Sequence, residues 1–170
     1  DNMNSENILK AFDINNVREG KLRDTLNRLN LNNFTFTIAD ATKCKFDNID
    51  IALCDVPCSG TGTIGKKSDL RWRVKMNNII EHSKKQSAII NNISKYINKN
   101  GALIYSTCSI EKEENWEVVN SFLDSHANFM IEDASKYVDK KYVDSNGAIN
   151  ILPHIHGIEG GFAVRLVKYA

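Results

Sequence analysis

The chain has 170 residues, of which 42% are hydrophobic and 25% are charged, values close to the averages for globular proteins. Its 22 Lys and Arg residues nearly balance its 21 Asp and Glu residues, giving a formal net charge of +1. This composition excludes a disordered, collagen-like or coiled-coil chain and argues against a strongly basic, histone-like nucleic-acid binder. No apolar run approaches the roughly 20 residues that a membrane-spanning helix requires.

The N-terminal part of the sequence predicts strands that alternate with a helix. Residues 8–14, 34–40 and 50–57 are largely apolar, with β-branched or aromatic side chains, which is typical of buried strands. Residues 16–30 carry apolar side chains at helical spacing and predict a helix between the first two strands.

A Gly-rich and basic loop then covers residues 58–73. Isoleucines at helical spacing predict a long helix over about 76–98, with Gly101 just past its end. The remaining predicted elements are a strand at 102–108, a helix around 112–125, a strand at 128–133, a polar connection at 134–161 and a strand at 162–169. This alternation predicts an α/β fold built on a parallel sheet.

The cysteines and histidines are not arranged as metal ligands. Cys44, Cys54, Cys58 and Cys108 form no C-x-x-C pair, and the four histidines lie far from them in sequence. We therefore expect no metal site and reduced thiols, as in a cytoplasmic protein. A redox centre made of Cys54 and Cys58 is disfavoured because their spacing is not that of a C-x-x-C motif.

Polar side chains stand where the predicted strands end, and ligands of parallel α/β sheets bind at that edge. Asp13, Asp40 and Asp55 each follow a predicted strand. An acid at the position of Asp13 binds ribose hydroxyls in nucleotide-binding folds, and Asp40 is placed to approach an adenine amino group. The alternative is that each aspartate only ends its strand, because Asp is common in turns.

Two short segments place cysteines at the same edge of the sheet. In Asp55-Val-Pro-Cys58, the proline fixes the backbone where a buried strand ends and presents Cys58 beside a glycine-rich loop. In Ser106-Thr-Cys-Ser109, Cys108 follows a strand and precedes an acidic helix start. A helix N-terminus favours the thiolate and the nearby glutamates oppose it, so the direction of any pKa shift stays open.

These two segments resemble the paired cysteine motifs of the Sun (RsmB-type) RNA cytosine-5 methyltransferases. The similarity covers nearly the whole chain, including the helix pattern up to Asn33, the segment 64–73 that ends in Asp-Leu-Arg-Trp-Arg, and residues 113–115. Residues 157–162 match more loosely, because the family has Asp-Gly-Phe-Phe there. The resemblance implies a Rossmann-like class I methyltransferase fold. It also implies methyl transfer from S-adenosylmethionine to carbon 5 of a cytosine in RNA, with ribosomal RNA as the substrate.

The resemblance also implies a role for each site residue. Cys108 is the nucleophile that adds to carbon 6 of the cytosine, and Cys58 assists release of the methylated RNA. Asp55 contacts the pyrimidine edge and lies close to the cofactor. The ribose and adenine of the cofactor are implied to bind Asp13 and Asp40.

A basic segment follows the first cysteine motif. Its cations are Lys66, Lys67, Arg71, Arg73 and Lys75, and it contains Trp72. The simple alternative is a solvated charged surface. Its position after the predicted catalytic loop favours RNA binding instead, with phosphate contacts and base stacking.

One family feature is not found in the sequence. The family carries a Gly-rich loop of the form Asp-x-Cys-Ala-Ala-Pro-Gly-Gly-Lys-Thr after a central strand between the strands that end here at Asp13 and Asp55. We therefore expect residues 1–170 to be a partial catalytic domain that binds the cofactor weakly and self-associates through exposed strand edges. The alternative function is a non-catalytic RNA-binding or assembly protein that keeps the fold.

Overall fold

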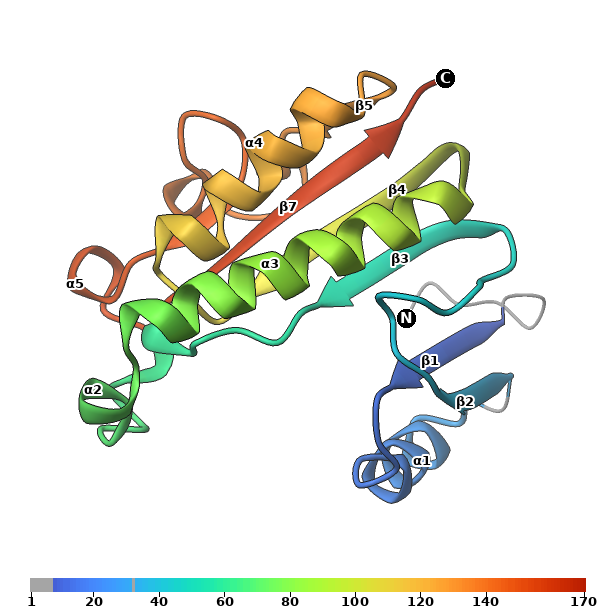
Figure 1. The fold of residues 1–170 in the computed structure, drawn as a ribbon, viewed down its shortest axis with the longest axis horizontal. Helices are drawn as coiled ribbons and strands as arrows, with labels where there is room; N and C mark the ends of the chain where they lie inside the picture. The colour runs from blue at the N-terminus through green and yellow to red at the C-terminus, as the bar shows by residue number, and fades with distance from the viewer. Residues whose placement is uncertain (1–7, 32) are drawn as a thin grey trace. The chain divides into compact units, whose positions relative to one another are not determined.

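A computed structural model describes residues 8–31 and 33–170 of the chain (Figure 1). Contacts between Cα atoms divide the protein into two compact units, Asp1–Lys45 and Phe46–Ala170. None of the helices in the described ranges is long and apolar enough to cross a membrane.

The first unit is a small β-α-β motif. Strand β1 (Leu9–Asp13) is followed by helix α1 (Glu19–Arg28) and strand β2 (Phe34–Ile38). The two strands pair in parallel, from Leu9 opposite Phe34 to Asp13 opposite Ile38. Helix α1 buries Leu26. It is shorter than the helix predicted over residues 16–30, and Val17, which lies before it, has 78% of its surface exposed.

The second unit is built on a five-stranded mixed sheet. Four strands lie in the order β3 (Ile49–Asp55), β4 (Ile97–Thr107), β7 (Gly161–Lys168) and β5 (Phe129–Glu132), and β6 (Ile149–Ile151) also pairs with β7. Strands β3 and β4 are parallel, but β7 runs antiparallel to both β4 and β5. The prediction of a parallel sheet is therefore wrong for the last strand, which returns through a long connection and inserts between β4 and β5.

Two helices cover one face of this sheet (Figure 1). Helix α3 (Met76–Ile93) lies over β3 and β4, and helix α4 (Trp116–Ser125) lies beside it. The core beneath them consists of almost fully buried apolar side chains, among them Ile90, Leu103, Tyr105, Val119, Phe122, Val164 and Leu166.

The boundary between α3 and β4 differs from the predicted one. The helix ends at Ile93, a 3₁₀ turn η2 (Ser94–Tyr96) follows, and the strand begins at Ile97. Gly101 therefore lies inside β4, where an added Cβ would come within 2.8 Å of the Asp50 carbonyl oxygen. Ile97 continues the isoleucine spacing of the helix, but its backbone pairs with Ile49. A helical repeat alone cannot reveal that pairing.

The remaining elements are short. They are η1 (Thr61–Thr63), α2 (Leu70–Arg73), η3 (Lys112–Glu114), η4 (Ala134–Lys136), η5 (Lys140–Tyr142) and α5 (Pro153–His156). The predicted helix at 112–125 is thus a 3₁₀ turn, η3, followed by α4. The elements η1 and η3 adjoin the two cysteine segments.

Candidate active site

The structure brings Cys58 and Cys108 together. Strands β3 and β4 are in parallel register, with Asp55 opposite Ser106, so both cysteine segments leave the sheet at the same edge. The two Sγ atoms lie 3.1 Å apart, and the backbone N–H of Cys108 donates a hydrogen bond to the Cys58 sulfur at 3.3 Å. Neither cysteine forms a disulfide, so the site presents two adjacent free thiols.

The thiols differ in their surroundings. Cys108 is exposed, whereas Cys58 is half-buried. Burial, followed by the hydrogen bond to Cys108 and the charge of Cys108, raises the pKa of Cys58 to about 12. Cys58 is therefore a neutral thiol at neutral pH and can donate to Cys108. Cys54 is 4% exposed and packs in the core, where burial raises its pKa to about 12 as well.

Glycines allow the loop after Cys58 to approach the rest of the site. The N–H of Gly62 donates to the Cys108 carbonyl oxygen at 3.0 Å, and the N–H of Gly160 donates to the Gly62 carbonyl oxygen at 2.9 Å. A Cβ at Gly62 would lie 2.4 Å from the Gly160 carbonyl oxygen. Only glycine fits there, and the segment 157–162 is thereby joined to the cysteine loops.

A buried carboxyl group is hydrogen-bonded to the first cysteine loop. Glu114 in η3 is fully buried, and it accepts hydrogen bonds from the Ser59 N–H at 2.8 Å and from the Ser59 hydroxyl. Gln86 of α3 is also fully buried, and its Nε2 donates to Glu114 at 3.0 Å and to the Pro57 carbonyl oxygen at 2.9 Å. These contacts hold the residues on both sides of Cys58.

Sequence reasoning missed this network, although one signal was available. Gln86 follows Ile79 by seven residues and precedes Ile90 and Ile93 by four and seven, so a polar side chain occupies a core position of the helix. Buried polar side chains need hydrogen-bond partners, so this pattern indicates a buried polar contact. The partners themselves, 28 and 29 residues away in sequence, could not have been named.

Further hydroxyl groups join the two cysteine segments. The Ser109 hydroxyl lies 3.2 Å from both the Ser59 and the Thr61 hydroxyls. Asn115 accepts a hydrogen bond from Thr107 at 2.6 Å and donates to the Ser109 carbonyl oxygen at 3.0 Å. Each cysteine is therefore followed by a buried serine, and the two serines are paired as the cysteines are.

A pocket of about 630 Å³ opens over the cysteines, a size typical of ligand sites. Its lining residues are Cys58, Ser59, Gly60, Lys67, Asp69, Leu70, Arg73, Val74, Asn78, His82 and Cys108. Sequence reasoning did not single out Asn78 or His82, because only the folded position of α3 places them in this wall.

The predicted RNA-binding cations have different surroundings. Lys67 and Arg73 line the pocket, and Arg73 pairs with Asp69 at 2.8 Å. Lys66 pairs with Glu159 at 3.1 Å. Arg71 is exposed on α2, next to Trp72, which has 84% of its surface exposed.

The predicted aspartates lie at strand ends in both units. Asp55 is the exposed last residue of β3, with one carboxyl oxygen 3.5 Å from the Ser106 hydroxyl. Asp13 and Asp40 belong to the first unit, at the same edge of the parallel pair β1 and β2. Each also accepts a local backbone hydrogen bond, from Asn15 at 3.1 Å and Thr42 at 2.9 Å. Carboxyl oxygens at a strand edge have the acceptor chemistry that ribose hydroxyls and an amino group require.

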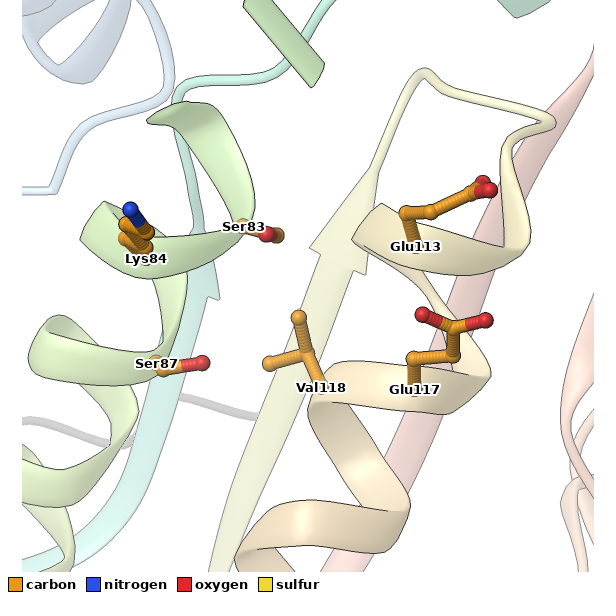
Figure 2. Close-up of a pocket in the computed structure, with 6 residues that line it drawn as sticks. All are labelled: Ser83, Lys84, Ser87, Glu113, Glu117 and Val118. Carbon is orange, nitrogen blue, oxygen red and sulfur yellow. The ribbon is translucent and has the colours of Figure 1, made fainter. Parts of the chain in front are cut away.

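A second hollow, of about 310 Å³, lies on the surface between α3 and the segment of η3 and α4. Figure 2 shows Ser83 and Ser87 of α3 facing Val118 of α4 across it. Lys84, Glu113 and Glu117 complete its lining, which contains no cysteine. Within residues 8–31 and 33–170, no group of three or more His, Cys, Asp and Glu side chains could hold a metal ion. The candidate active site is the cysteine pocket, because it contains the two adjacent thiols.

Solved structures agree with this fold. The crystal structure of PH0851 superposes with a TM-score of 0.86 and 31% identity, over 95% of this chain and 37% of that one. NSun6 from Pyrococcus horikoshii, solved with SFG, gives a TM-score of 0.82 and 25% identity, over 96% of this chain and 42% of that one. The mixed sheet and its neighbours define a class I methyltransferase fold.

Sequence comparison identifies the family within the class I methyltransferases. The family model described as "16S rRNA methyltransferase RsmB/F" matches residues 1–167. The Ribosomal RNA small subunit methyltransferase B of Photorhabdus laumondii is 33% identical over 170 aligned residues, which cover 96% of this chain and 37% of that protein. The chain belongs to the RsmB/F family of 16S rRNA methyltransferases. It spans well under half the length of these relatives, and the family implies S-adenosylmethionine as the cofactor.

Proposed function

We propose that this chain carries the two catalytic cysteines of an RNA cytosine-5 methyltransferase that acts on ribosomal RNA through a covalent Cys–RNA intermediate. The observation that supports this most strongly is the 3.1 Å separation of the Cys58 and Cys108 sulfurs at one edge of the sheet. Two thiols in one pocket suit a reaction in which one bonds to the cytosine and the other assists release of the methylated RNA.

Cys108 is the nucleophile in this proposal. It is the exposed thiol of the pair, and its neighbour Cys58 is placed to donate a hydrogen bond to its sulfur. Carbon 5 of cytosine is a poor nucleophile, but addition of a thiolate to carbon 6 makes it enamine-like. S-adenosylmethionine, when bound, supplies the electrophilic methyl group. Asp55, at the end of β3, would hydrogen-bond the pyrimidine edge and favour protonation of the ring as the thiol adds.

Cys58 has its role in the second half of the reaction. Once Cys108 is bonded to carbon 6, its sulfur carries no thiolate charge, so the contribution of that charge to the raised pKa of Cys58 disappears. Cys58, next to the Cys108 sulfur, then acts as the base: it loses its own proton to solvent and, as a thiolate, takes the proton from carbon 5. The bond between Cys108 and carbon 6 breaks with that proton transfer, and Cys108 leaves as a thiolate.

We assign cofactor binding to the aspartates that stand at the strand ends. Asp13 would bind the ribose hydroxyls, Asp40 the adenine amino group, and Asp55 would lie next to the cofactor. We further propose that residues 1–170 form a partial catalytic domain that binds S-adenosylmethionine weakly alone, because the family's Gly-rich loop is not found in the sequence.

The pocket wall suits an RNA nucleotide. Lys67 and Arg73 line it, Lys66 and Arg71 lie in the same basic segment, and the exposed Trp72 offers a stacking surface. The target cytosine must be unstacked to reach Cys108, so a single-stranded, looped or flipped-out base is the expected substrate.

The test is a covalent trap, measured with the native full-length protein, S-adenosylmethionine and ribosomal RNA. The Cys58→Ala variant should accumulate a denaturation-resistant protein–RNA adduct, because the methylated base cannot be released. The double variant Cys58→Ala/Cys108→Ala should form none. RNA binding that neither substitution changes, with no adduct in any form, would indicate a non-catalytic RNA-binding or assembly protein instead.

A further inference from the structure

We propose that Glu114 is a positioning residue that holds Cys58 in place for release of the methylated RNA. This inference rests on the proposed function for the reaction step, but its structural part concerns only the two cysteine loops. Glu114 has no exposed surface, so it cannot contact the RNA or the cofactor directly from where it lies. Its effect must pass through the residues to which it is hydrogen-bonded.

The hydrogen bonds of Glu114 and Gln86 reach the residues on both sides of Cys58. Ser59, immediately after Cys58, donates both its backbone N–H and its hydroxyl to the two carboxyl oxygens of Glu114. Gln86 donates to Glu114 and also to the carbonyl oxygen of Pro57, immediately before Cys58. Three donors converge on one buried carboxyl group, and loss of such an acceptor leaves buried N–H groups unpaired.

Cys108 depends less on Glu114. Cys108 directly follows Thr107, the last residue of β4, and this strand is paired on both sides, by β3 and β7. The residues next to this cysteine are held by Asn115, through Thr107 and the Ser109 carbonyl oxygen. Ser109 reaches Ser59 through one hydroxyl contact, but it also has Thr61 as a partner. A change at Glu114 should therefore displace Cys58 while Cys108 keeps its place.

The two cysteines serve different steps in the proposed reaction, so this asymmetry has a kinetic consequence. Formation of the bond to carbon 6 depends mainly on Cys108, whereas release depends on Cys58. A displacement of about 1 Å can slow a chemical step by about 100-fold. Replacement of Glu114 should slow release far more than it slows adduct formation.

The main experiment compares Glu114→Gln with Glu113→Gln in single-turnover reactions of the native full-length protein. Both substitutions remove one carboxyl group from η3, but Glu113 lines the surface groove between α3 and α4 (Figure 2). We expect Glu114→Gln to slow release at least about tenfold and to accumulate adduct, with adduct formation within about threefold of wild type. Glu113→Gln should behave as wild type.

A second readout needs no catalysis. Alkylation of the thiols by iodoacetamide, followed by mass spectrometry of each cysteine peptide, reports how well each sulfur is held. In Glu114→Gln we expect Cys58 to react several-fold faster than in wild type, because a displaced Cys58 is less buried. Cys108, and Cys44 of the first unit, should react at unchanged rates.

Ser59→Ala supplies a milder variant, because it removes one hydroxyl donor and keeps the backbone N–H that Glu114 accepts. It should shift release and Cys58 alkylation in the same direction, by a smaller factor. If Glu114→Gln does not fold, Ser59→Ala tests the positioning role of Glu114 with the same two readouts.

Two results would overturn the positioning role: equal slowing of adduct formation and release, or unchanged release together with unchanged Cys58 alkylation. Failure of the proposed function gives a different pattern. In that case Cys58→Ala traps no adduct, while the alkylation of Cys58 still responds to Glu114→Gln.

Discussion

Two hollows border helix α3 in the second unit, and they differ in the residues that line and support them. The cysteine pocket rests on fully buried polar side chains, with Glu114 and Gln86 hydrogen-bonded to the backbone on either side of Cys58. The groove between α3 and α4 is lined by polar side chains such as Ser83, Lys84 and Glu117, which lie at the surface (Figure 2). Buried hydrogen bonds fix reactive groups, so the difference favours the cysteine pocket as the site of the proposed reaction.

The largest expected effect is on the reaction itself. Cys108→Ala should lower methyl transfer to RNA on the order of 1,000-fold or more, because it removes the proposed nucleophile. Lys84→Ala, in the groove, should leave the rate unchanged. The measurement is the incorporation of labelled methyl groups into ribosomal RNA by the native full-length protein. Equal losses in both variants would remove the distinction between the two hollows.

The second prediction concerns the stability of the fold above neutral pH. The pKa of Cys54 is raised by burial from about 9 to about 12, so the unfolded chain loses this proton more readily than the folded one. The stabilising contribution is complete below pH 9 and is lost as the pH rises through 12, to a limit of about 4 kcal/mol. Denaturant unfolding from pH 8 to 11 should show the free energy of unfolding falling less steeply in Cys54→Ala than in wild type. Parallel pH curves would contradict the expected contribution of this thiol.

The third prediction concerns the loop that carries Cys58. Gly62→Ala should lower the free energy of unfolding by about 1–3 kcal/mol, because the new Cβ would overlap the Gly160 backbone. Gly65→Ala is the matched control, since a Cβ at Gly65 has nothing within 4 Å. Denaturant unfolding of both variants measures the difference. Equal stability of the two would mean that the loop can move away from Gly160.

The smallest expected effect is on RNA affinity. Lys67→Ala should weaken RNA binding a few-fold and lower the slope of log K against log salt by about 1, because one phosphate contact is lost. Lys84→Ala should change neither value. Fluorescence titrations of RNA at several salt concentrations give both. A normal slope in Lys67→Ala would exclude this side chain from phosphate binding.

The sequence predicted most of the elements and the position of the cysteines, because strand ends and helical repeats are local patterns. The meeting of Cys58 with Cys108 could be expected from neighbouring parallel strands. The antiparallel direction of β7 was not predicted, because a long connection allows either direction. The contact of Glu114 with Ser59 joins residues 55 positions apart and leaves no periodic signal. The pocket walls at Asn78 and His82 likewise depend on where α3 lies.

The most direct measurement is to find which residue bonds to the RNA. The adduct trapped in Cys58→Ala would be digested with protease and nuclease, and the nucleotide-bearing peptide identified by mass spectrometry. We expect the nucleotide to be a cytosine methylated at carbon 5 and attached through carbon 6 to the sulfur of Cys108. Attachment at any other residue, or a Cys58→Ala protein that turns over without an adduct, would contradict the assignment of the two cysteines.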